Sequence, residues 1–121
     1  MTPANAAYSA VELRHQLVSS GTKALVTCMP LLDTALLAAK EAGIPGQNIF
    51  IMDLPGLDGK RHKRFASVEE LIKEGERLPD LDGLRWVKGQ GERQTAFLCY
   101  SSGTSGVPVR HTPTHTLTAQ C

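Results

Sequence analysis

The first apolar pattern along the chain has the spacing of an α-helix. Ser9 and Glu12 form a capping box, in which each side chain satisfies a backbone N–H at the start of a helix. Apolar residues then recur at roughly helical spacing as far as Gly21, and glycine commonly follows the end of a helix. The pattern predicts a helix from about Ser9 to Ser20.

Two short apolar runs flank a stretch that is rich in Leu and Ala. The runs, Lys23–Thr27 and Asn48–Met52, have the composition of buried strands, and the stretch between them, Leu31–Ala42, consists largely of strong helix formers. Gly43 and Pro45 then provide a C-terminal stop for the helix. A strand, a helix and a strand in this order predict a parallel pair with a right-handed crossover.

Loop-forming residues dominate the middle of the chain. Residues 53–65 contain Pro, Gly, Asp and a basic cluster at 60–64, and they predict a solvated surface loop. A second capping box, Ser67 with Glu70, predicts a short helix that ends near residue 75. Residues 77–92 then predict a long irregular connection.

A third apolar run, residues 95–100, predicts a buried strand. Cys99 lies inside this run, so we expect its thiol to behave as a small apolar group and not as a nucleophile. Residues 109–118 are again β-prone but are interrupted by Pro113. The whole pattern predicts an α/β fold with a small, mostly parallel sheet flanked by helices.

Composition narrows the class of protein. The 121 residues are the size of one domain, and apolar (41%) and charged (21%) fractions are those of an ordinary globular protein. A net charge of +1 provides no field to attract nucleic acid or a membrane surface, and no apolar run is long enough to span a bilayer. Three widely spaced cysteines without a C-x-x-C pair indicate reduced thiols, which predicts a cytoplasmic protein without a metal site.

The third apolar run opens into a loop of hydroxyl-bearing residues and glycine. Gly103 and Gly106 allow positive φ angles that turn backbone N–H groups inward. Four hydroxyl groups surround the same concavity, those of Ser101, Ser102, Thr104 and Ser105. The spacing is neither that of a Walker A loop nor that of a dinucleotide fingerprint. Residues 101–108 therefore predict a phosphate-binding loop, with a nucleotide triphosphate as its ligand.

The loop resembles the signature loop of the adenylate-forming ligases, the superfamily of acyl-CoA synthetases and 4-coumarate–CoA ligases. The match holds from Ser101 to Pro108, and Val109 then stands where the family has a lysine. A deletion at the lysine would produce the same sequence. Several segments upstream also look like those of acyl- and aryl-CoA ligases, including Tyr8–Ala10, Lys23–Thr27 and Glu41–Pro45.

The resemblance implies a partial N-terminal domain over residues 1–121 and a ligase reaction in two steps. In this family a carboxylate attacks ATP to form an acyl-adenylate, and the thiol of coenzyme A then captures the acyl group, with Mg²⁺ screening the phosphates. Residues 101–106 would hold the β- and γ-phosphates. His115 could match a family position near the acyl pocket, although its polar surroundings favour an exposed histidine over a pocket residue.

Two other interpretations stay open. Family members continue for several hundred residues beyond the loop, so we expect this chain not to complete either half-reaction alone. It could instead be a stand-alone, non-catalytic protein that binds a nucleotide weakly or associates with a full-length ligase. It could also be a truncated product without function, because a sheet cut after its phosphate loop exposes apolar faces.

Overall fold

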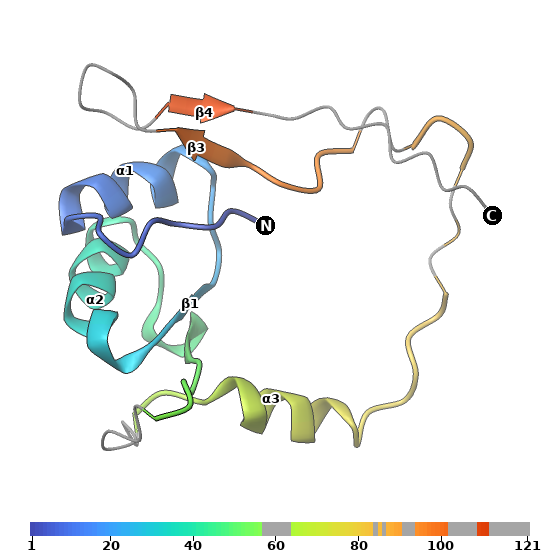
Figure 1. Ribbon diagram of the computed structural model, residues 1–121. Coiled ribbons are helices and arrows are strands. Elements are labelled where there is room, and N and C mark those ends of the chain that lie inside the picture. The colour runs from blue at the N-terminus through green and yellow to red at the C-terminus, as the bar shows by residue number, and fades with distance from the viewer. Residues whose placement is uncertain (57–63, 84, 86, 91–93, 102–108, 112–121) are drawn as a thin grey trace. The chain divides into compact units, whose positions relative to one another are not determined.

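The computed structural model describes residues 1–56, 64–83, 85, 87–90, 94–101 and 109–111 (Figure 1), and only the backbone of residues 101 and 109–111. It contains two compact units. One unit consists of residues 5–80, and the other combines residues 1–4 with residues 81–121. Each unit has its own two-stranded sheet.

Helix α1 (Ala10–Ser19) begins and ends as its sequence predicts. The Ser9 backbone N–H donates to Glu12 Oε2 at 2.8 Å, and the Glu12 backbone N–H donates to Ser9 Oγ at 3.4 Å. These two bonds complete the capping box and satisfy N–H groups that have no partner inside the helix. At the other end, Gly21 has a φ of +65°, which lets the Thr22 N–H reach the Leu17 carbonyl at 3.0 Å.

Strand β1 (Leu25–Thr27), helix α2 (Leu32–Glu41) and strand β2 (Ile49–Ile51) form the predicted strand–helix–strand unit. The two strands are parallel, with Leu25 opposite Ile49 and Thr27 opposite Ile51. Short 3-10 turns, Met29–Leu31 and Gly46–Asn48, lead into α2 and into β2. The predicted parallel pair is therefore confirmed, together with the α/β class of the fold.

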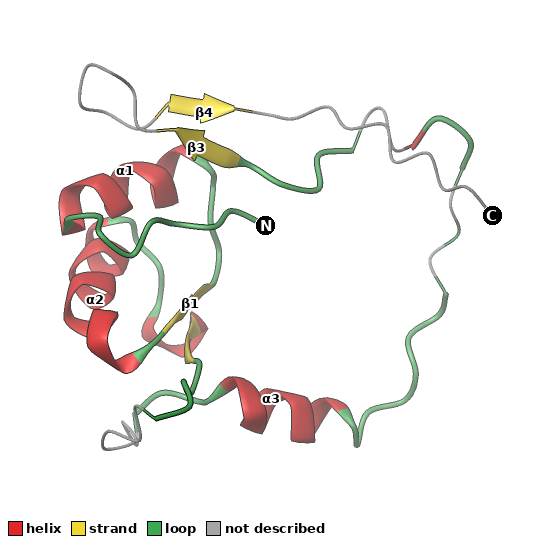
Figure 2. Cartoon of the chain, in the orientation of Figure 1, coloured by secondary structure: helices red, strands yellow, loops and turns green. Residues whose placement is uncertain are grey.

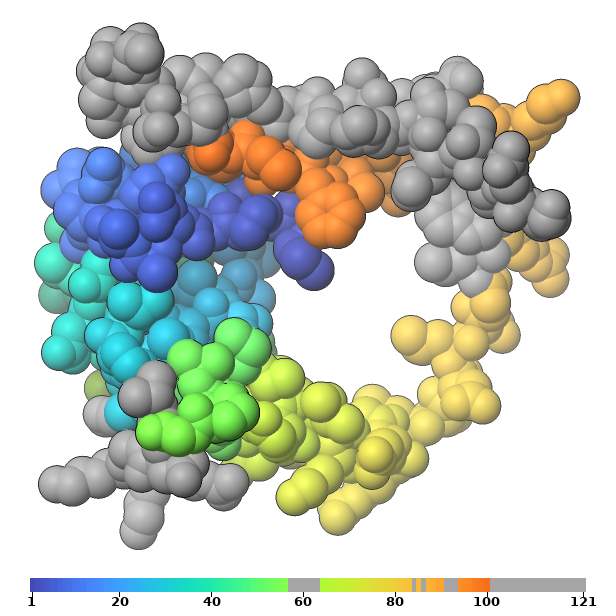
Figure 3. Space-filling model, viewed as in Figure 1, coloured from blue at the N-terminus to red at the C-terminus, as the bar shows by residue number. Residues whose placement is uncertain are grey.

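One face of the β1–β2 sheet packs against both helices. The buried side chains of this core come from β2, from both helices and from the segments beside them: Leu13, Leu17, Leu32, Ala38, Ala39, Ile44, Ile49, Ile51 and Phe65. Leu25 of β1 is partly buried and packs against them. In the space-filling view the blue surface of α1 and the cyan surface of α2 meet without a gap (Figure 3). An ion pair between Arg14 and Glu41 at 3.6 Å joins the helices at the surface.

Phe65 and Ser67 correct one expectation about the middle of the chain. The sequence predicts a surface loop through residue 65, but Phe65 is 9% exposed and belongs to the core, and Ile51 forms a parallel bridge with Ser67. The Arg64 guanidinium lies 5.7 Å from the centroid of the Phe65 ring. The loop therefore returns to the edge of the sheet before the next helix starts. Residues 57–63, which include most of the basic cluster, lie outside the described residues.

Helix α3 (Val68–Gly75) has the second predicted capping box, in which Ser67 and Glu70 exchange two hydrogen bonds of 2.8 and 3.1 Å. None of its residues is buried. Its apolar residues nevertheless share one face, because Val68, Leu71 and Ile72 are spaced three and four apart. The described residues between 77 and 90 are mostly loop, as predicted (Figure 2).

The third strand differs from its prediction in length, burial and pairing. Strand β3 (Cys99–Ser101) starts four residues later than the apolar run, and it pairs antiparallel with β4 (Val109–His111) in a separate sheet. Phe97 is 49% exposed and Cys99 is exposed as well. The expectation of a buried Cys99 is therefore wrong, because within the described residues neighbouring elements do not cover this run on both faces.

None of the helices in the described parts of the chain combines the length and the apolar character that crossing a bilayer requires.

Two leucines, one buried and one exposed, test whether the core lies between the helices and one face of the sheet. Leu17 on α1 is 3% exposed, whereas Leu37 on α2 is 52% exposed. We expect Leu17→Ala to lower the free energy of unfolding by about 3 kcal/mol, because it leaves a cavity in the core. Leu37→Ala should change it by less than about 0.5 kcal/mol. Urea unfolding followed by circular dichroism measures both, and equal losses would contradict this account of the core.

The α1 capping box predicts a dependence of stability on pH. Hydrogen bonds from the Ser9 hydroxyl and backbone N–H lower the pKa of Glu12 below its ordinary value of 4.5. Because the Glu12 carboxyl has a lower pKa in the folded chain than in the unfolded chain, its ionisation stabilises the fold at pH values above the pKa of the unfolded chain. This contribution is lost as the pH falls through the pKa of the folded chain. The effect is small because Glu12 lies at the surface.

Urea unfolding between about pH 6 and about pH 3 checks this sign. Glu12→Gln should lose stability less steeply on acidification than the unchanged chain. Ser9→Ala removes the donating hydroxyl and should flatten the profile in the same direction. Identical acid profiles for all three chains would show that the capping box does not influence the titration of Glu12.

Candidate phosphate-binding site

The predicted phosphate loop lies between two paired strands. Ser101 ends β3 and Val109 begins β4, and these two residues are opposite each other in the antiparallel register. Tyr100 and Arg110 form the next pair. Residues opposite each other in an antiparallel sheet have Cα atoms about 4.5–5.5 Å apart. The pairing therefore holds Ser101 and Val109, the two residues that flank the loop, side by side.

The segment that precedes β3 is bound by the first residue of the chain. The Met1 ammonium donates to the Ala96 carbonyl at 3.0 Å, and the Leu98 N–H donates to the Met1 carbonyl at 2.9 Å. Together with the β3–β4 pairing, these bonds mean that backbone hydrogen bonds position the strand from which the loop starts. Backbone hydrogen bonds of this kind depend little on the side chains of β3 and of the residues before it.

The structure places one of the predicted phosphate-binding residues. Ser101 is the last residue of β3. The other five, Ser102, Gly103, Thr104, Ser105 and Gly106, lie outside the described residues, as does His115. The prediction that these residues bind phosphate or line an acyl pocket therefore rests on their sequence. Their sequence neighbours in β3 and β4 add that the loop begins and ends at one paired position.

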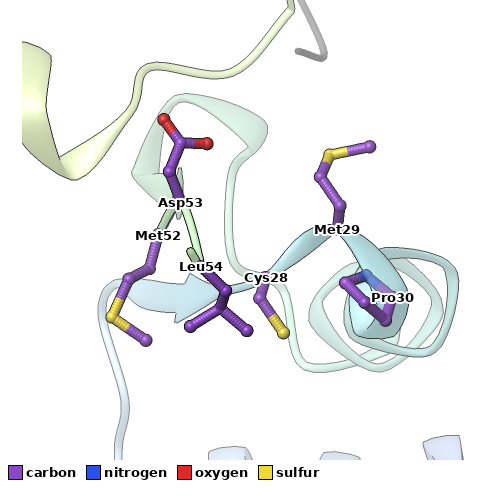
Figure 4. Close-up of a pocket in the computed structure, with 6 residues that line it drawn as sticks. All are labelled: Cys28, Met29, Pro30, Met52, Asp53 and Leu54. Carbon is purple, nitrogen blue, oxygen red and sulfur yellow. The ribbon is translucent and has the colours of Figure 1, made fainter. Parts of the chain in front are cut away.

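A small pocket lies at the carboxyl ends of β1 and β2. Its lining comes from the three residues that follow each strand, namely Cys28, Met29, Pro30, Met52, Asp53 and Leu54 (Figure 4). In α/β sheets, ligands bind at this edge. The volume of the pocket is about 10 Å³, however, which is room for about one water molecule. It therefore cannot hold a nucleotide or an acyl chain.

The sequence analysis did not identify this pocket, although its signal was available. The predicted strands Lys23–Thr27 and Asn48–Met52 form a parallel pair, so the residues that follow them must lie at one edge of the sheet. Cys28 is a partly buried free thiol. The described residues contain no cluster of three His, Cys, Asp or Glu side chains that could hold a metal ion.

Comparison with known proteins identifies the family. No family model matches the chain. It is 37% identical over 109 residues to the acyl-CoA ligase cm3C of Cordyceps militaris, a match that covers 86% of this chain and 17% of that protein. The acyl-CoA ligase easD of Emericella nidulans is 40% identical over 87 residues, covering 69% of this chain and 15% of the relative. Over the matched segment, this chain belongs to the acyl-CoA ligases.

Acyl-CoA ligase AKT1 of Alternaria alternata gives a similar result, with 37% identity over 103 residues, 84% of this chain and 18% of the relative. The resemblance to the adenylate-forming superfamily is confirmed by these relatives. The chain spans 15–20% of the length of the acyl-CoA ligases that it matches. It is thus similar to one segment of a much larger enzyme.

Proposed function

We propose that residues 101–106 of this acyl-CoA ligase segment hold the β- and γ-phosphates of ATP. The single observation that carries the proposal is the loop sequence itself, four hydroxyl-bearing residues and two glycines, at the end of a strand in a member of this family. The Ser101–Val109 pairing supports it, because a loop closed at its base needs less ordering when it encloses a ligand.

The residues of the loop suit the chemistry that the proposal assigns to them. Phosphate oxygens accept hydrogen bonds, and both hydroxyl groups and glycine backbone N–H groups can donate them. Pyrophosphate leaves when a carboxylate attacks the α-phosphate, so donors fixed around the β- and γ-phosphates position the leaving group and stabilise its charge. When bound, Mg²⁺ would neutralise part of that charge. Coenzyme A acts in the second half-reaction, and no residue of this chain is assigned to it.

In this proposal the segment contributes to adenylation and thioester formation only as part of a longer ligase. The segment that this chain matches is only 15–20% of the length of each relative, so most of such a ligase lies outside it. The adenine pocket and the acyl pocket would be built mainly by the rest of such a chain. His115 keeps its predicted place near the acyl pocket as an untested part of the proposal.

A second candidate function is favoured by Val109. The family resemblance assigns a lysine to this position, and β4 begins here with an uncharged residue. Without that cation, a stand-alone protein could bind a nucleotide without activating it. The two candidates differ in the ATP affinity of the chain and in what a restored lysine does to it.

ATP binding measured by isothermal titration calorimetry, with and without Mg²⁺, separates them. We expect millimolar or tighter binding in the unchanged chain. Gly103→Val should abolish it, because a β-branched side chain disfavours the positive φ that the sequence predicts for this glycine. Val109→Lys should tighten binding by about tenfold, since hydrogen bonds to charged groups are worth about 1.5–3 kcal/mol.

Val87→Lys is the matched control. It adds the same charge at an exposed position, 65% accessible, in the same unit of the chain. A general electrostatic effect would tighten ATP binding equally in both lysine variants. If the unchanged chain and Val109→Lys both fail to bind ATP, the phosphate site has no function in this segment, and the proposal is wrong.

A further inference from the structure

The main chain of Met1 bonds to the segment that leads into β3. The Met1 nitrogen donates to the Ala96 carbonyl at 3.0 Å, and the Leu98 N–H donates to the Met1 carbonyl at 2.9 Å. Ala96 and Leu98 flank Phe97, and bonds from one residue to both neighbours of the opposite residue are the pattern of parallel strands. Figure 1 shows the two segments running in the same direction. Met1 is therefore paired with Phe97 as in a parallel sheet.

These bonds join two parts of the chain that are far apart in sequence. One compact unit combines residues 1–4 with residues 81–121, and residues 5–80 form the other unit. The apolar run before the loop thus has two partners along its length, because Met1 bonds to residues 96 and 98 and β4 pairs with residues 99–101. Both Met1 bonds use main-chain atoms, so a residue at this position would make them equally within a longer chain.

Side-chain burial contributes little to the position of this run. None of the described residues 94–100 is buried, Phe97 is 49% exposed and Leu98 is only partly buried. The described residues between 77 and 90, which precede the run, are mostly loop. Within the described residues, the backbone bonds to Met1 and to β4 therefore constrain this run more than side-chain packing does.

We propose that residues 1–4 are a positioning segment for the phosphate loop, because Met1 holds the strand that ends at Ser101 in one register. The inference rests on the proposed function, since it concerns the ATP affinity of the same loop. A strand that slides by two residues, the smallest shift that keeps the same alternation of side chains, moves by about 6.6 Å. A loop whose starting residue is fixed before ATP arrives also has less conformational entropy to lose on binding.

A proline at residue 98 tests the pairing without a change in Met1. Leu98→Pro removes the N–H that donates to the Met1 carbonyl, whereas Leu98→Ala shortens the side chain and keeps this N–H. We expect Leu98→Pro to weaken ATP binding to the whole chain by about tenfold, and Leu98→Ala by less than about twofold. Thr95→Pro is the matched control for the proline ring, because the Thr95 N–H takes part in neither Met1 bond. It should leave the ATP affinity unchanged.

Deletion of Thr2–Ala4 is the second variant, because it removes the residues that carry Met1 to Ala96 and leaves the Asn5–Asp80 unit intact. We expect about tenfold weaker ATP binding and faster hydrogen exchange at the Leu98 amide, which loses its acceptor. Hydrogen exchange of the amides in α1 and α2 should stay as it is in the unchanged chain. A general loss of stability would instead speed exchange in these helices as well.

The exchange of the Leu98 amide is measured without nucleotide, so it tests the pairing apart from the phosphate site. Equal exchange at Leu98 in the unchanged chain and in the deletion would overturn the proposal. ATP affinity that is the same in these two chains would reject the positioning role and leave the phosphate site intact. An unchanged chain that binds no ATP would reject the phosphate site, and the positioning role with it.

Discussion

The contact of α1 and α2 with the inner face of the β1–β2 sheet is the interaction on which the Asn5–Asp80 unit depends. Ala38 and Ala39 on α2 are fully buried in the same core as Leu13 and Leu17 on α1. Side chains this small let two helices and a sheet approach closely. Because α1 and α2 pack on one side, the described residues of this unit leave Val26, on the other face of the sheet, 53% exposed.

Local features of the chain were predictable from sequence. Both capping boxes form, and glycines with positive φ follow both α1 and α2, at Gly21 and Gly43. These motifs work through hydrogen bonds between residues two to five apart, so a short window of sequence contains all the partners. The parallel β1–β2 pair followed as well, because a helix of that length between two apolar runs permits few other connections.

Features that depend on distant partners were not predictable. The burial of Phe65 requires a core built from residues more than ten positions away, and nothing in the polar residues before it signals a return to the sheet. Cys99 lies in an apolar run like the two that became β1 and β2, yet it is exposed and pairs with His111 in an antiparallel sheet. An apolar run predicts a strand, but the partner decides whether that strand is buried.

The phosphate-binding loop was likewise predictable from the sequence in part only. The order of hydroxyl groups and glycines could be read from the chain, and the match to acyl-CoA ligases confirms the family that this order suggested. The pairing of Ser101 with Val109 adds a feature that the sequence did not predict, a loop whose two ends meet.

The most direct test of the central claim is the response of backbone amide resonances to ATP with Mg²⁺, measured by nuclear magnetic resonance on the 121-residue chain. The account predicts that the largest shifts occur at the amides of residues 101–106, with little change in the core residues of α1 and α2. Saturating ATP that leaves those amides unmoved, or that shifts residues scattered over both units, would contradict it.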